Sequence, residues 1–297
     1  HPLAEAPLGR PRMIPAAPQE KPIGRPGSLA RSALPTRLAV TALVGITLVF
    51  YHGLWMPGLV LIKGDAFAFY LVIKQYLIER LAAGELPQWF PYEALGRPFI
   101  GTTITGVFHP FTALYFLLPV PDAYRASTLI SCLLAAIGAF GLGRTLGVSR
   151  AGALLAGIAF TLSGYVVSLT CHLAYLYSIC ALPLFCATLE LSLRDNRAWA
   201  VAAAVTWATV FLNGDVQTGY YYGFIALLWT VARAPGPYRE ACLRLTLVGG
   251  LAVLLAGIQL GPAWVVFTSS ERAHHGRFLE FAMQWSTHPL RLASILA

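Results

Sequence analysis

Asp65 is the residue whose type and position in this sequence most directly suggest chemistry. It follows Gly64 shortly after an apolar segment that ends near Trp55, so we expect it close to a membrane surface, at the start of a helix. A carboxylate there can accept a proton from an attacking hydroxyl group or hold a divalent cation. Aspartate is also a favoured N-cap residue, so Asp65 could serve only to cap the helix that begins at Ala66. The two roles are compatible, and the sequence leaves both open.

Histidines form a second group of candidates, because six of the seven are expected on the same side of the membrane as Asp65. They are His52, His109, His172, His274, His275 and His288. A single histidine is more often a hydrogen-bonded structural residue than a ligand or an acid–base group. Together, however, the six suggest a polar cavity that handles phosphate or sugar hydroxyl groups.

Asp215 is the third candidate, in the polar turn Asn213–Gln217 between two short apolar segments. An ionisable residue beside hydrocarbon is costly unless it is used, so Asp215 marks a possible binding site. The alternative is an ordinary turn aspartate at the membrane surface. A further polar segment, Ser269–Arg272 followed by His274, His275 and Arg277, is rich in groups that bind phosphate or carboxylate, but it could equally be a solvated loop.

The composition indicates the kind of protein that must position these residues. Of the 297 residues, 57% are hydrophobic and only 11% are charged, and the mean hydropathy is +0.65. These values exclude an ordinary soluble domain and predict a polytopic protein of a lipid bilayer. The net charge of +8 does not indicate a nucleic-acid partner, because the basic residues are not clustered with exposed aromatics on a compact domain. The five cysteines lie mostly in apolar runs and are expected to be small packing residues.

Apolar segments close to the roughly 20 residues needed to cross a bilayer predict an all-α bundle of about seven spans. The expected spans are Arg37–Trp55, Tyr124–Gly143, Ala151–Thr170, Ala174–Leu193, Ala198–Leu212, Gly219–Val231 and Leu245–Phe267. Residues 1–36 are rich in proline and arginine and are expected to form a disordered tail. The chain is therefore divided into this tail and a transmembrane domain over residues 37–297.

Charge predicts the orientation, since lysine and arginine accumulate in cytoplasmic loops. A cytoplasmic N-terminal tail places 13 of the 21 lysines and arginines, but only 5 of the 13 acids, on the cytoplasmic side. Residues 56–123 then form a large first outer loop, and loops of this length are usually functional. Within it, Ala66–Ala83 is expected to be a helix lying in the membrane surface. The segment Val107–Val120 is too short to cross and is expected to be interfacial or re-entrant.

The polar side of that surface helix is expected to carry Lys74, Gln75, Glu79 and Arg80.

The loop motifs resemble those of the YfhO-like family of bacterial membrane proteins. The residues that carry the resemblance are Gly64-Asp65, Gly84-x-Leu86-Pro87-x-Trp89-x-Pro91, Gly96-x-Pro98, Phe108-His109-Pro110, Gln259–Trp264 and Ser286-x-His288-Pro289. The resemblance extends from about Arg37 to the end of the sequence. The family is similar to GT-C fold glycosyltransferases, which take a sugar from a polyprenyl-phosphate carrier on the outer side of the membrane. Because the family's chains are longer, we expect this chain to be truncated at its C-terminus.

The resemblance implies a GT-C-like glycosyltransferase in the bacterial cytoplasmic membrane, with Asp65 as the base that deprotonates the acceptor, alone or with Mg or Mn. The donor would be a polyprenyl-phosphate-linked sugar, and the acceptor a cell-envelope glycan, a teichoic acid or a protein. The departing phosphate needs positive charge or hydrogen-bond donors, for which the candidates are Lys63, Arg97, His109 and Arg272. The candidates for contact with the substrate are His172, Asp215 and Gln217.

The alternative is a transporter or lipid flippase without catalytic chemistry. In that case Asp215 and the short helices beside it would form a site near the middle of the membrane. Two observations argue against it: the polar groups collect in one outer loop, and the seven apolar segments show no internal repeat.

Overall fold

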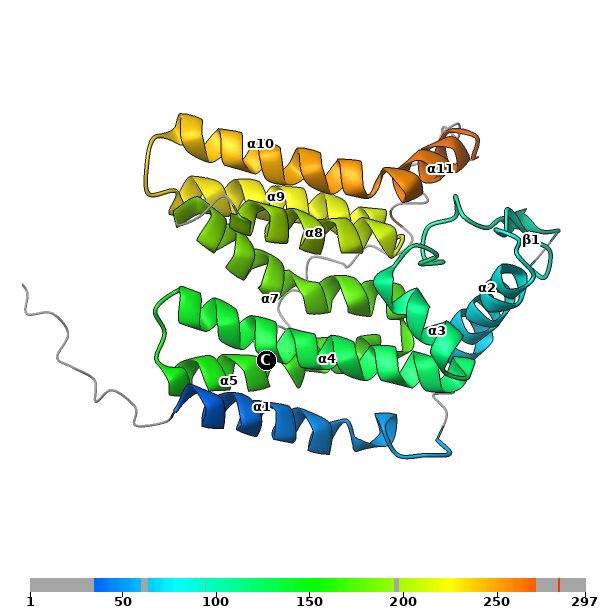
Figure 1. Ribbon diagram of the computed structural model, residues 1–297, viewed down its shortest axis with the longest axis horizontal. Coiled ribbons are helices and arrows are strands. Elements are labelled where there is room, and N and C mark those ends of the chain that lie inside the picture. The colour runs from blue at the N-terminus through cyan, green and yellow to red at the C-terminus, as the bar shows by residue number, and fades with distance from the viewer. Residues whose placement is uncertain (1–34, 60–63, 94, 195–197, 271–282, 284–297) are drawn as a thin grey trace, which may run out of the picture. The chain divides into compact units, whose positions relative to one another are not determined.

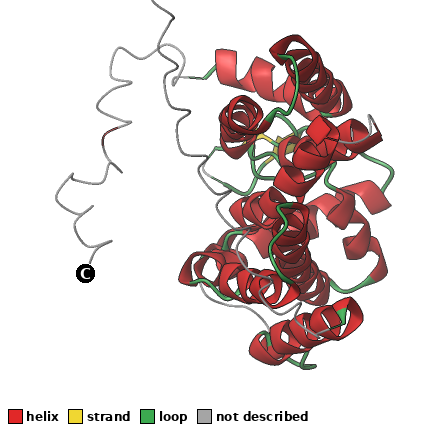
Figure 2. Ribbon diagram, turned by 90° about the vertical axis from the view of Figure 1, so that its left-hand side faces the viewer, coloured by secondary structure: helices red, strands yellow, loops and turns green. Residues whose placement is uncertain are grey.

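A computed structural model describes residues 35–59, 64–93, 95–194, 198–270 and 283. These residues are almost entirely helical, as Figure 2 shows in a view along the helices. The sheet among them is a single antiparallel pair of two-residue strands, β1 (Trp89–Phe90) and β2 (Arg97–Pro98), with Phe90 opposite Arg97. The all-α prediction is confirmed for the described residues. The expected tail over residues 1–36 lies outside them, apart from its last two residues.

The long helices lie side by side with their axes roughly aligned (Figure 1). They are α1 (Thr36–Phe50), α4 (Val120–Thr145), α5 (Arg150–Thr161), α7 (Leu173–Arg194), α8 (Ala198–Leu212), α9 (Val216–Arg233) and α10 (Tyr238–Leu255). Successive helices run in opposite directions, so their connections fall at two ends. We call the end where α1 begins the arginine end; residues 145–150 and 233–238 lie there. We call the opposite end the loop end; residues 51–59, 64–119, 162–172 and 213–215 lie there.

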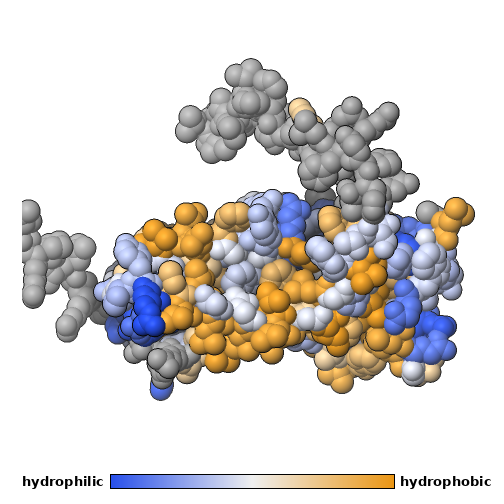
Figure 3. All heavy atoms as spheres, turned by 90° about the horizontal axis from the view of Figure 1, so that it is seen from above, coloured by the Kyte–Doolittle hydropathy of each residue, from blue (hydrophilic) through white to orange (hydrophobic). Residues whose placement is uncertain are grey.

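The charges of the described residues are divided unequally between these two ends. The arginine end carries Arg37, Arg144, Arg150, Arg194, Arg233, Arg239 and Arg244 against Glu190 and Glu240. The loop end carries Lys74, Arg80, Arg97 and Arg125 against Asp65, Glu79, Glu85, Glu93, Asp122 and Asp215. Figure 3 shows hydrophilic residues toward both ends and mostly apolar surface between them. This is the distribution expected of a protein whose helices cross a membrane.

Three helical segments are long and apolar enough to cross a membrane, namely Val120–Thr145, Arg150–Cys171 and Leu173–Arg194. Each coincides with one of the expected spans. A fourth is formed if α10 and α11 (Gly257–Thr268) are one span, although their axes differ by 75°. The helices α1 and α8 are apolar but shorter. The described residues therefore suit a multi-pass membrane protein, while the count of seven spans stays a prediction.

Surface apolarity gives independent support for a lipid environment. Only 22% of the most apolar stretch of Arg150–Cys171 is buried against the rest of the chain, although it is as hydrophobic as α4. Large apolar side chains such as Leu155, Leu228 and Leu254 point outward. Apolar surface of this extent is rare on soluble monomers, and it indicates contact with lipid.

Small residues allow the central helices to approach closely, as is common in membrane bundles. A Cβ atom added at Gly157 of α5 would lie 2.9 Å from the Ala136 carbonyl oxygen of α4. A Cβ atom at Gly138 of α4 would lie 3.0 Å from the Leu184 nitrogen of α7. Cys132 and Cys180 are buried in the same region, in the packing role that the sequence predicts for the cysteines.

The loop end is built around a helix that begins directly after Asp65. A π-helical segment, η2 (Ala66–Leu71), continues into α2 (Val72–Ala82), and Gly84, with φ +77°, follows its end. The predicted helix Ala66–Ala83 is thereby confirmed. The segment Val107–Val120 contains the short helices η3 (Pro110–Ala113) and α3 (Leu114–Leu117), neither of which could cross a bilayer, and α4 begins at its last residue.

One expectation about this helix is wrong. Gln75, Glu79 and Arg80 are exposed as predicted, but Lys74 is almost completely buried. The physical reason is that residues 105–115 of the same loop fold over this face of the helix and supply partners for the ammonium group.

Candidate functional site

Asp65 and His172, predicted separately as a base and a substrate-binding residue, form a pair at the loop end. Asp65 Oδ2 lies 3.1 Å from His172 Nδ1, within hydrogen-bonding distance. The Asp65 side chain is 58% exposed and that of His172 is 36% exposed. Asp65 makes no side-chain hydrogen bond to the first turn of η2. The structure therefore gives the carboxylate a histidine partner in place of the capping role that the sequence left open.

Local backbone geometry brings this pair together. Gly64 adopts φ +57°, a left-handed conformation that favours glycine, and its Cα faces the side chain of Cys171. Cys171 ends the short helix η4 (Leu169–Cys171), and His172 follows it directly before α7. The contact between residues 64 and 171 thus places their chain neighbours, Asp65 and His172, against each other.

Tyr70 lies near the Asp65–His172 pair, because it packs in one buried cluster with Ala66, Cys171 and Leu173. Its side chain is buried, and burial raises the pKa of Tyr70 well above its ordinary value. The negative charges of Asp65 and Asp215 act on this pKa in the same direction. Both carboxylates therefore lie close enough to the Tyr70 hydroxyl for their charges to affect it.

Asp215 is buried and caps α9, which distinguishes it from an exposed turn aspartate. The Thr218 N–H donates to Asp215 Oδ1 at 3.0 Å. Among the described residues Asp215 Oδ2 has no hydrogen-bond partner, although it is buried. Its neighbour Asn213 donates from Nδ2 to the Ala174 carbonyl of α7 at 2.6 Å. The turn is thereby fixed to the start of α7, next to His172.

Gln217, the other residue predicted in this turn, points outward and donates from Nε2 to the Tyr221 hydroxyl at 2.9 Å. It belongs to the wall of a groove of about 480 Å³ between α7, α9 and the segment 165–169. Four tyrosines line this groove: Tyr165, Tyr175, Tyr221 and Tyr222.

Two of the predicted phosphate-binding residues, Arg97 and His109, are described, and of these two Arg97 has an unused cationic donor. Its Nε donates to Glu93 Oε2 at 2.7 Å, and its guanidinium lies 5.4 Å from the centre of the Phe69 ring. Its Nη2 is buried without a partner among the described residues. Phe69 belongs to η2, so Arg97 packs against the same short helix that Asp65 precedes.

His109 is a buried structural residue whose acceptor nitrogen is occupied. The Phe111 N–H donates to His109 Nδ1 at 3.2 Å, and the imidazole stacks on Tyr177 with ring centres 4.7 Å apart. Burial lowers the pKa of His109 to about 3, and the nearby charge of Lys74 acts in the same direction. At neutral pH this side chain therefore brings no positive charge to a phosphate. Lys63 and Arg272, the remaining members of the predicted set, lie outside the described residues.

Lys74 is a buried lysine, although the sequence predicts it on the exposed polar side of its helix. Its Nζ donates to the carbonyls of Thr105 at 2.9 Å and Gly106 at 3.3 Å, and it lies 5.3 Å from the centre of the Tyr115 ring. Burial lowers the pKa of Lys74 to about 7. The loop that it holds also contacts the Asp215 turn, because the Ile104 N–H donates to the Gly214 carbonyl at 3.3 Å. No local sequence signal distinguishes Lys74 from an exposed lysine.

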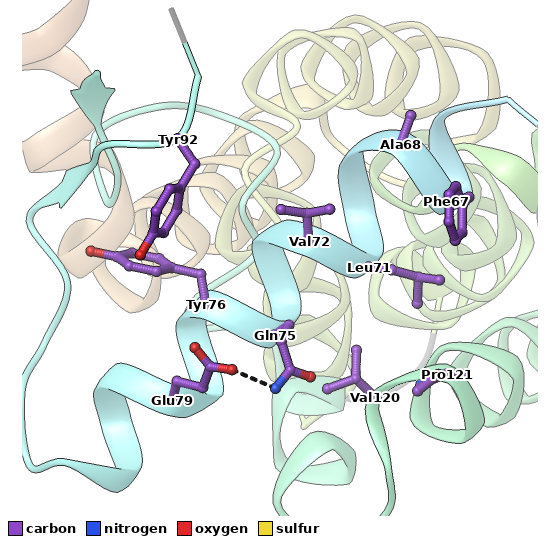
Figure 4. Close-up of a pocket in the computed structure, with 10 residues that line it drawn as sticks. All are labelled: Phe67, Ala68, Leu71, Val72, Gln75, Tyr76, Glu79, Tyr92, Val120 and Pro121. Atoms are coloured by element: carbon purple, nitrogen blue, oxygen red, sulfur yellow. Dashed lines mark hydrogen bonds between the residues drawn. The ribbon is translucent and has the colours of Figure 1, made fainter. Parts of the chain in front are cut away.

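A second groove, of about 620 Å³, lies between the loop helix and the start of α4 (Figure 4). Its wall is largely apolar and includes Phe67, Leu71, Val72 and Val120. Gln75 donates to Glu79 at 2.7 Å on one side of it, and the rings of Tyr76 and Tyr92 meet edge to face on another. Asp65 is two residues before Phe67 of this groove, and His172 is three residues before Tyr175 of the first one. Each member of the Asp65–His172 pair is thus close in sequence to one groove wall, although neither residue lines a groove.

The resemblance allows Asp65 to act either alone or with a divalent cation. Among the described residues, no group of three or more His, Cys, Asp or Glu side chains could hold a metal ion. Asp65 and His172 are a pair, and they do not form a metal site by themselves.

Comparison of the chain with protein-family models, with curated proteins and with solved structures gives no match. The resemblance of the loop motifs to the YfhO-like family stays a prediction. A function for this chain must therefore rest on its own residues and their geometry.

Proposed function

We propose that this chain is a membrane glycosyltransferase that moves a sugar from a polyprenyl-phosphate donor to a cell-envelope acceptor at the loop end. The observation that carries the proposal is the Asp65–His172 pair. Its carboxylate is exposed, is not used as a helix cap, and has an imidazole nitrogen 3.1 Å away. A positioned carboxylate with an orienting partner is the arrangement that general-base chemistry requires.

In the proposed reaction Asp65 accepts the proton of the acceptor hydroxyl group. The acceptor oxygen forms a bond to the anomeric carbon, and the bond from that carbon to the phosphate oxygen breaks, so that the polyprenyl phosphate leaves with the electron pair. His172, donating from Nδ1, holds one carboxylate oxygen and leaves the other to take the proton. Arg97 is the described cation that would stabilise the leaving phosphate, together with Lys63 and Arg272.

The distribution of charge supports an extracytoplasmic position for this site. The arginine-rich end of the bundle is the cytoplasmic end under the positive-inside rule, which places the loop end outside. We propose seven spans, with α1, α8 and α9 added to the three long segments and with α10 and α11 together as the seventh. In this topology the tail is cytoplasmic and the membrane is the bacterial cytoplasmic membrane.

The groove between the loop helix and α4 supports a lipid-linked donor. Its apolar wall suits a prenyl chain, because contact with Phe67, Leu71 and Val120 removes hydrocarbon from water. The tyrosine-lined groove on the other side, with Gln217 in its wall, suits the hydroxyl groups of a glycan. Donor and acceptor would then meet at the Asp65–His172 pair.

The proposal is tested by the release of a labelled hexose from undecaprenyl phosphate. The chain, Asp65→Asn and Glu85→Gln are purified into lipid nanodiscs with a lipid-linked acceptor. Because general-base catalysis contributes about 10²- to 10⁴-fold, Asp65→Asn should lose that factor in turnover. Glu85 is a comparably exposed acid of the same loop, 55% against 58%, and its variant should keep full turnover. Equal turnover by the wild type and Asp65→Asn would remove Asp65 as the base.

A lipid flippase or transporter is the second candidate, and one observation favours it. Asp215, in the turn between α8 and α9, buries a carboxylate oxygen without a partner among the described residues, and α10 and α11 form a helix pair bent by 75°. Broken helices around a buried acid are typical of transporter sites. Movement of a labelled prenyl-phosphate sugar across vesicles without sugar transfer, abolished in Asp215→Asn but not in Asp65→Asn, would favour this candidate.

A further inference from the structure

A separate charged cluster lies at the arginine end, on the opposite side of the molecule from Asp65. Its centre is Glu190 of α7, whose side chain is completely buried. Glu190 Oε1 lies 2.5 Å from Arg194 Nε and 2.8 Å from Arg233 Nη2, and Trp229 Nε1 donates to Oε2 at 2.7 Å. The carboxylate is thus fully partnered, and two guanidinium groups surround a single acid. The cluster carries a net positive charge.

A polar pocket of about 170 Å³ adjoins this cluster. It lies between the end of α7, the loop 234–237 and the start of α10, and both Arg194 and Arg244 line it. One water occupies about 30 Å³ in the liquid, so the pocket has room for a polyatomic anion. Glu240, the acid in its wall, is already paired with Arg244 Nη2 at 2.7 Å.

The two terminal nitrogens of the Arg244 guanidinium have hydrogen-bond partners, whereas its Nε has none among the described residues. Its Nη1 donates to the Ser192 carbonyl, and its Nη2 contacts Glu240. Its Nε is buried and has no hydrogen-bond partner among the described residues. Leaving a buried charged donor without a partner is costly, so the Arg244 guanidinium would be stabilised by an anion in the pocket that this residue lines.

An apolar groove of about 420 Å³ lies beside the same cluster. It is lined by Leu146 at the end of α4 and by one face of α9 that ends at Arg233. Arg233 in this groove and Arg194 in the polar pocket bind the same Glu190 oxygen, so both hollows border the cluster. An apolar groove that ends beside an arginine-lined pocket matches the two parts of a phospholipid, an acyl chain and a phosphate.

We propose that the arginine end holds an anionic phospholipid, with its phosphate in the pocket between Arg194 and Arg244 and an acyl chain along α9. The depth is suitable, because the pocket lies at the helix ends, where headgroups are found, and basic pockets between helices bind such lipids. The exposed Tyr238 at the start of α10 is typical of the same interface. This proposal is independent of the glycosyl-transfer proposal, because it concerns the opposite end of the bundle.

The first test compares variants by native mass spectrometry and by melting temperature, in phosphatidylcholine nanodiscs with and without phosphatidylglycerol. The wild type should retain one phosphatidylglycerol and melt higher in its presence. Arg194→Gln and Arg244→Gln should weaken retention about tenfold or more, since each removes a charge-assisted contact. Arg37→Gln, which removes an exposed arginine of the same end outside the pocket, should behave as the wild type. Equal losses in all three variants would indicate diffuse charge attraction and overturn the proposal.

A second pair of variants keeps every arginine. Its result therefore cannot arise from misfolding caused by the loss of the structural contacts of Arg194 or Arg244. A Cβ atom added at Gly236 meets nothing within 4 Å, and this glycine lines the pocket. Gly236→Glu should expel the lipid by repelling its phosphate, whereas Gly236→Gln, of the same size, should retain much more of it. Retention of phosphatidylglycerol in Gly236→Glu at the wild-type level would contradict the proposal.

A third arm distinguishes the lipid headgroup from free phosphate. Inorganic phosphate is added to the wild type in phosphatidylcholine nanodiscs, and the melting temperature is measured. A lipid site predicts a shift with phosphatidylglycerol and a much smaller shift with phosphate. An equal shift with phosphate, together with no retained lipid in the mass spectrum, would overturn the lipid assignment.

Discussion

At the scale of single residues, a buried ammonium and a buried imidazole lie close together at the loop end. Lys74 is held by the carbonyls of Thr105 and Gly106, and His109 stacks on Tyr177 while its Nδ1 accepts from Phe111. Burial disfavours the charged form of both, which lowers the pKa of Lys74 to about 7 and that of His109 to about 3. Both groups therefore link the stability of the loop to pH.

The sign of this dependence follows from the two pKa values. Between pH 7 and 10.5 the unfolded chain keeps the Lys74 proton that the folded chain has released, so stability rises with pH in this window. Between pH 3 and 6.5 the unfolded chain binds a proton at His109 that the folded chain does not, so stability falls as pH drops. The melting temperature of the wild type minus that of Lys74→Met, measured by tryptophan fluorescence, should therefore increase from pH 7 to 10.

Arg80→Met provides the matched control, because Arg80 is an exposed cation of the same helix. Its melting temperature should differ from that of the wild type by a constant amount over this range. A constant difference for Lys74→Met as well would show that Lys74 titrates at its ordinary value.

Sequence reasoning identified both members of the Asp65–His172 pair but not their contact. Local composition indicates the chemistry of each residue and the side of the membrane on which it is expected. The contact depends on packing between Gly64 and Cys171, which are far apart in the chain, and periodicity carries no information about it. Lys74 was misplaced for a related reason. The hydrophobic pattern of one helix gives its faces but does not show which face another part of the loop covers.

At the scale of elements, the loop end is fixed by close backbone contacts at glycines. Gly214 has φ +90°, and a Cβ atom there would lie 2.4 Å from the Ile104 nitrogen. Gly106 has φ +59°, and a Cβ atom there would lie 3.2 Å from both Asn213 Oδ1 and Lys74 Nζ. These two positions allow the loop to pack against the turn that carries Asp215.

Substitution of these glycines should lower the free energy of unfolding, because an added Cβ atom would approach neighbouring atoms too closely. Gly214→Ala forces a side chain into a left-handed position against backbone, and should destabilise the chain by about 1–3 kcal/mol or more. Gly45→Ala is the control, since this glycine lies inside α1 with nothing within 4 Å of an added Cβ atom. It should leave stability unchanged or raise it by about 0.5–1 kcal/mol. The denaturation midpoints of Gly214→Ala and Gly45→Ala are measured in the same detergent. Equal changes of the midpoint in the two variants would contradict the proposed packing.

Helix positions were predicted well where length and apolarity determine them, as for α4 and α7. The apolar run Leu245–Phe267 was expected to be one span, but α10 and α11 meet at 75°. Hydropathy indicates the length of an apolar segment but not whether the helix axis bends within it. The buried Gln259 of α11 donates to the Ile100 carbonyl at 2.9 Å, and this polar contact draws α11 toward the loop.

At the scale of the whole molecule, the charges, the apolar surface and the grooves agree on one arrangement. Positive charge gathers at one end and acids, with the Asp65–His172 pair, at the other, and the surface between them is mostly apolar on the face that Figure 3 shows. Composition predicts this arrangement because the arrangement depends on the total charge and hydropathy of whole segments. An error at a single position hardly changes these totals. The proposed chemistry needs the loop end to face the extracytoplasmic water.

Labelling of residue 65 tests that requirement most directly. Asp65→Cys is prepared in a Cys242→Ser background, because Cys242 is the exposed cysteine among the five and the others are buried. Val148→Cys, in the exposed turn between α4 and α5 at the arginine end, is the matched control. In intact cells a membrane-impermeant maleimide should label residue 65 at once and residue 148 only after permeabilisation. Labelling of residue 148 but not of residue 65 in intact cells would place the pair on the cytoplasmic side and contradict the proposed function.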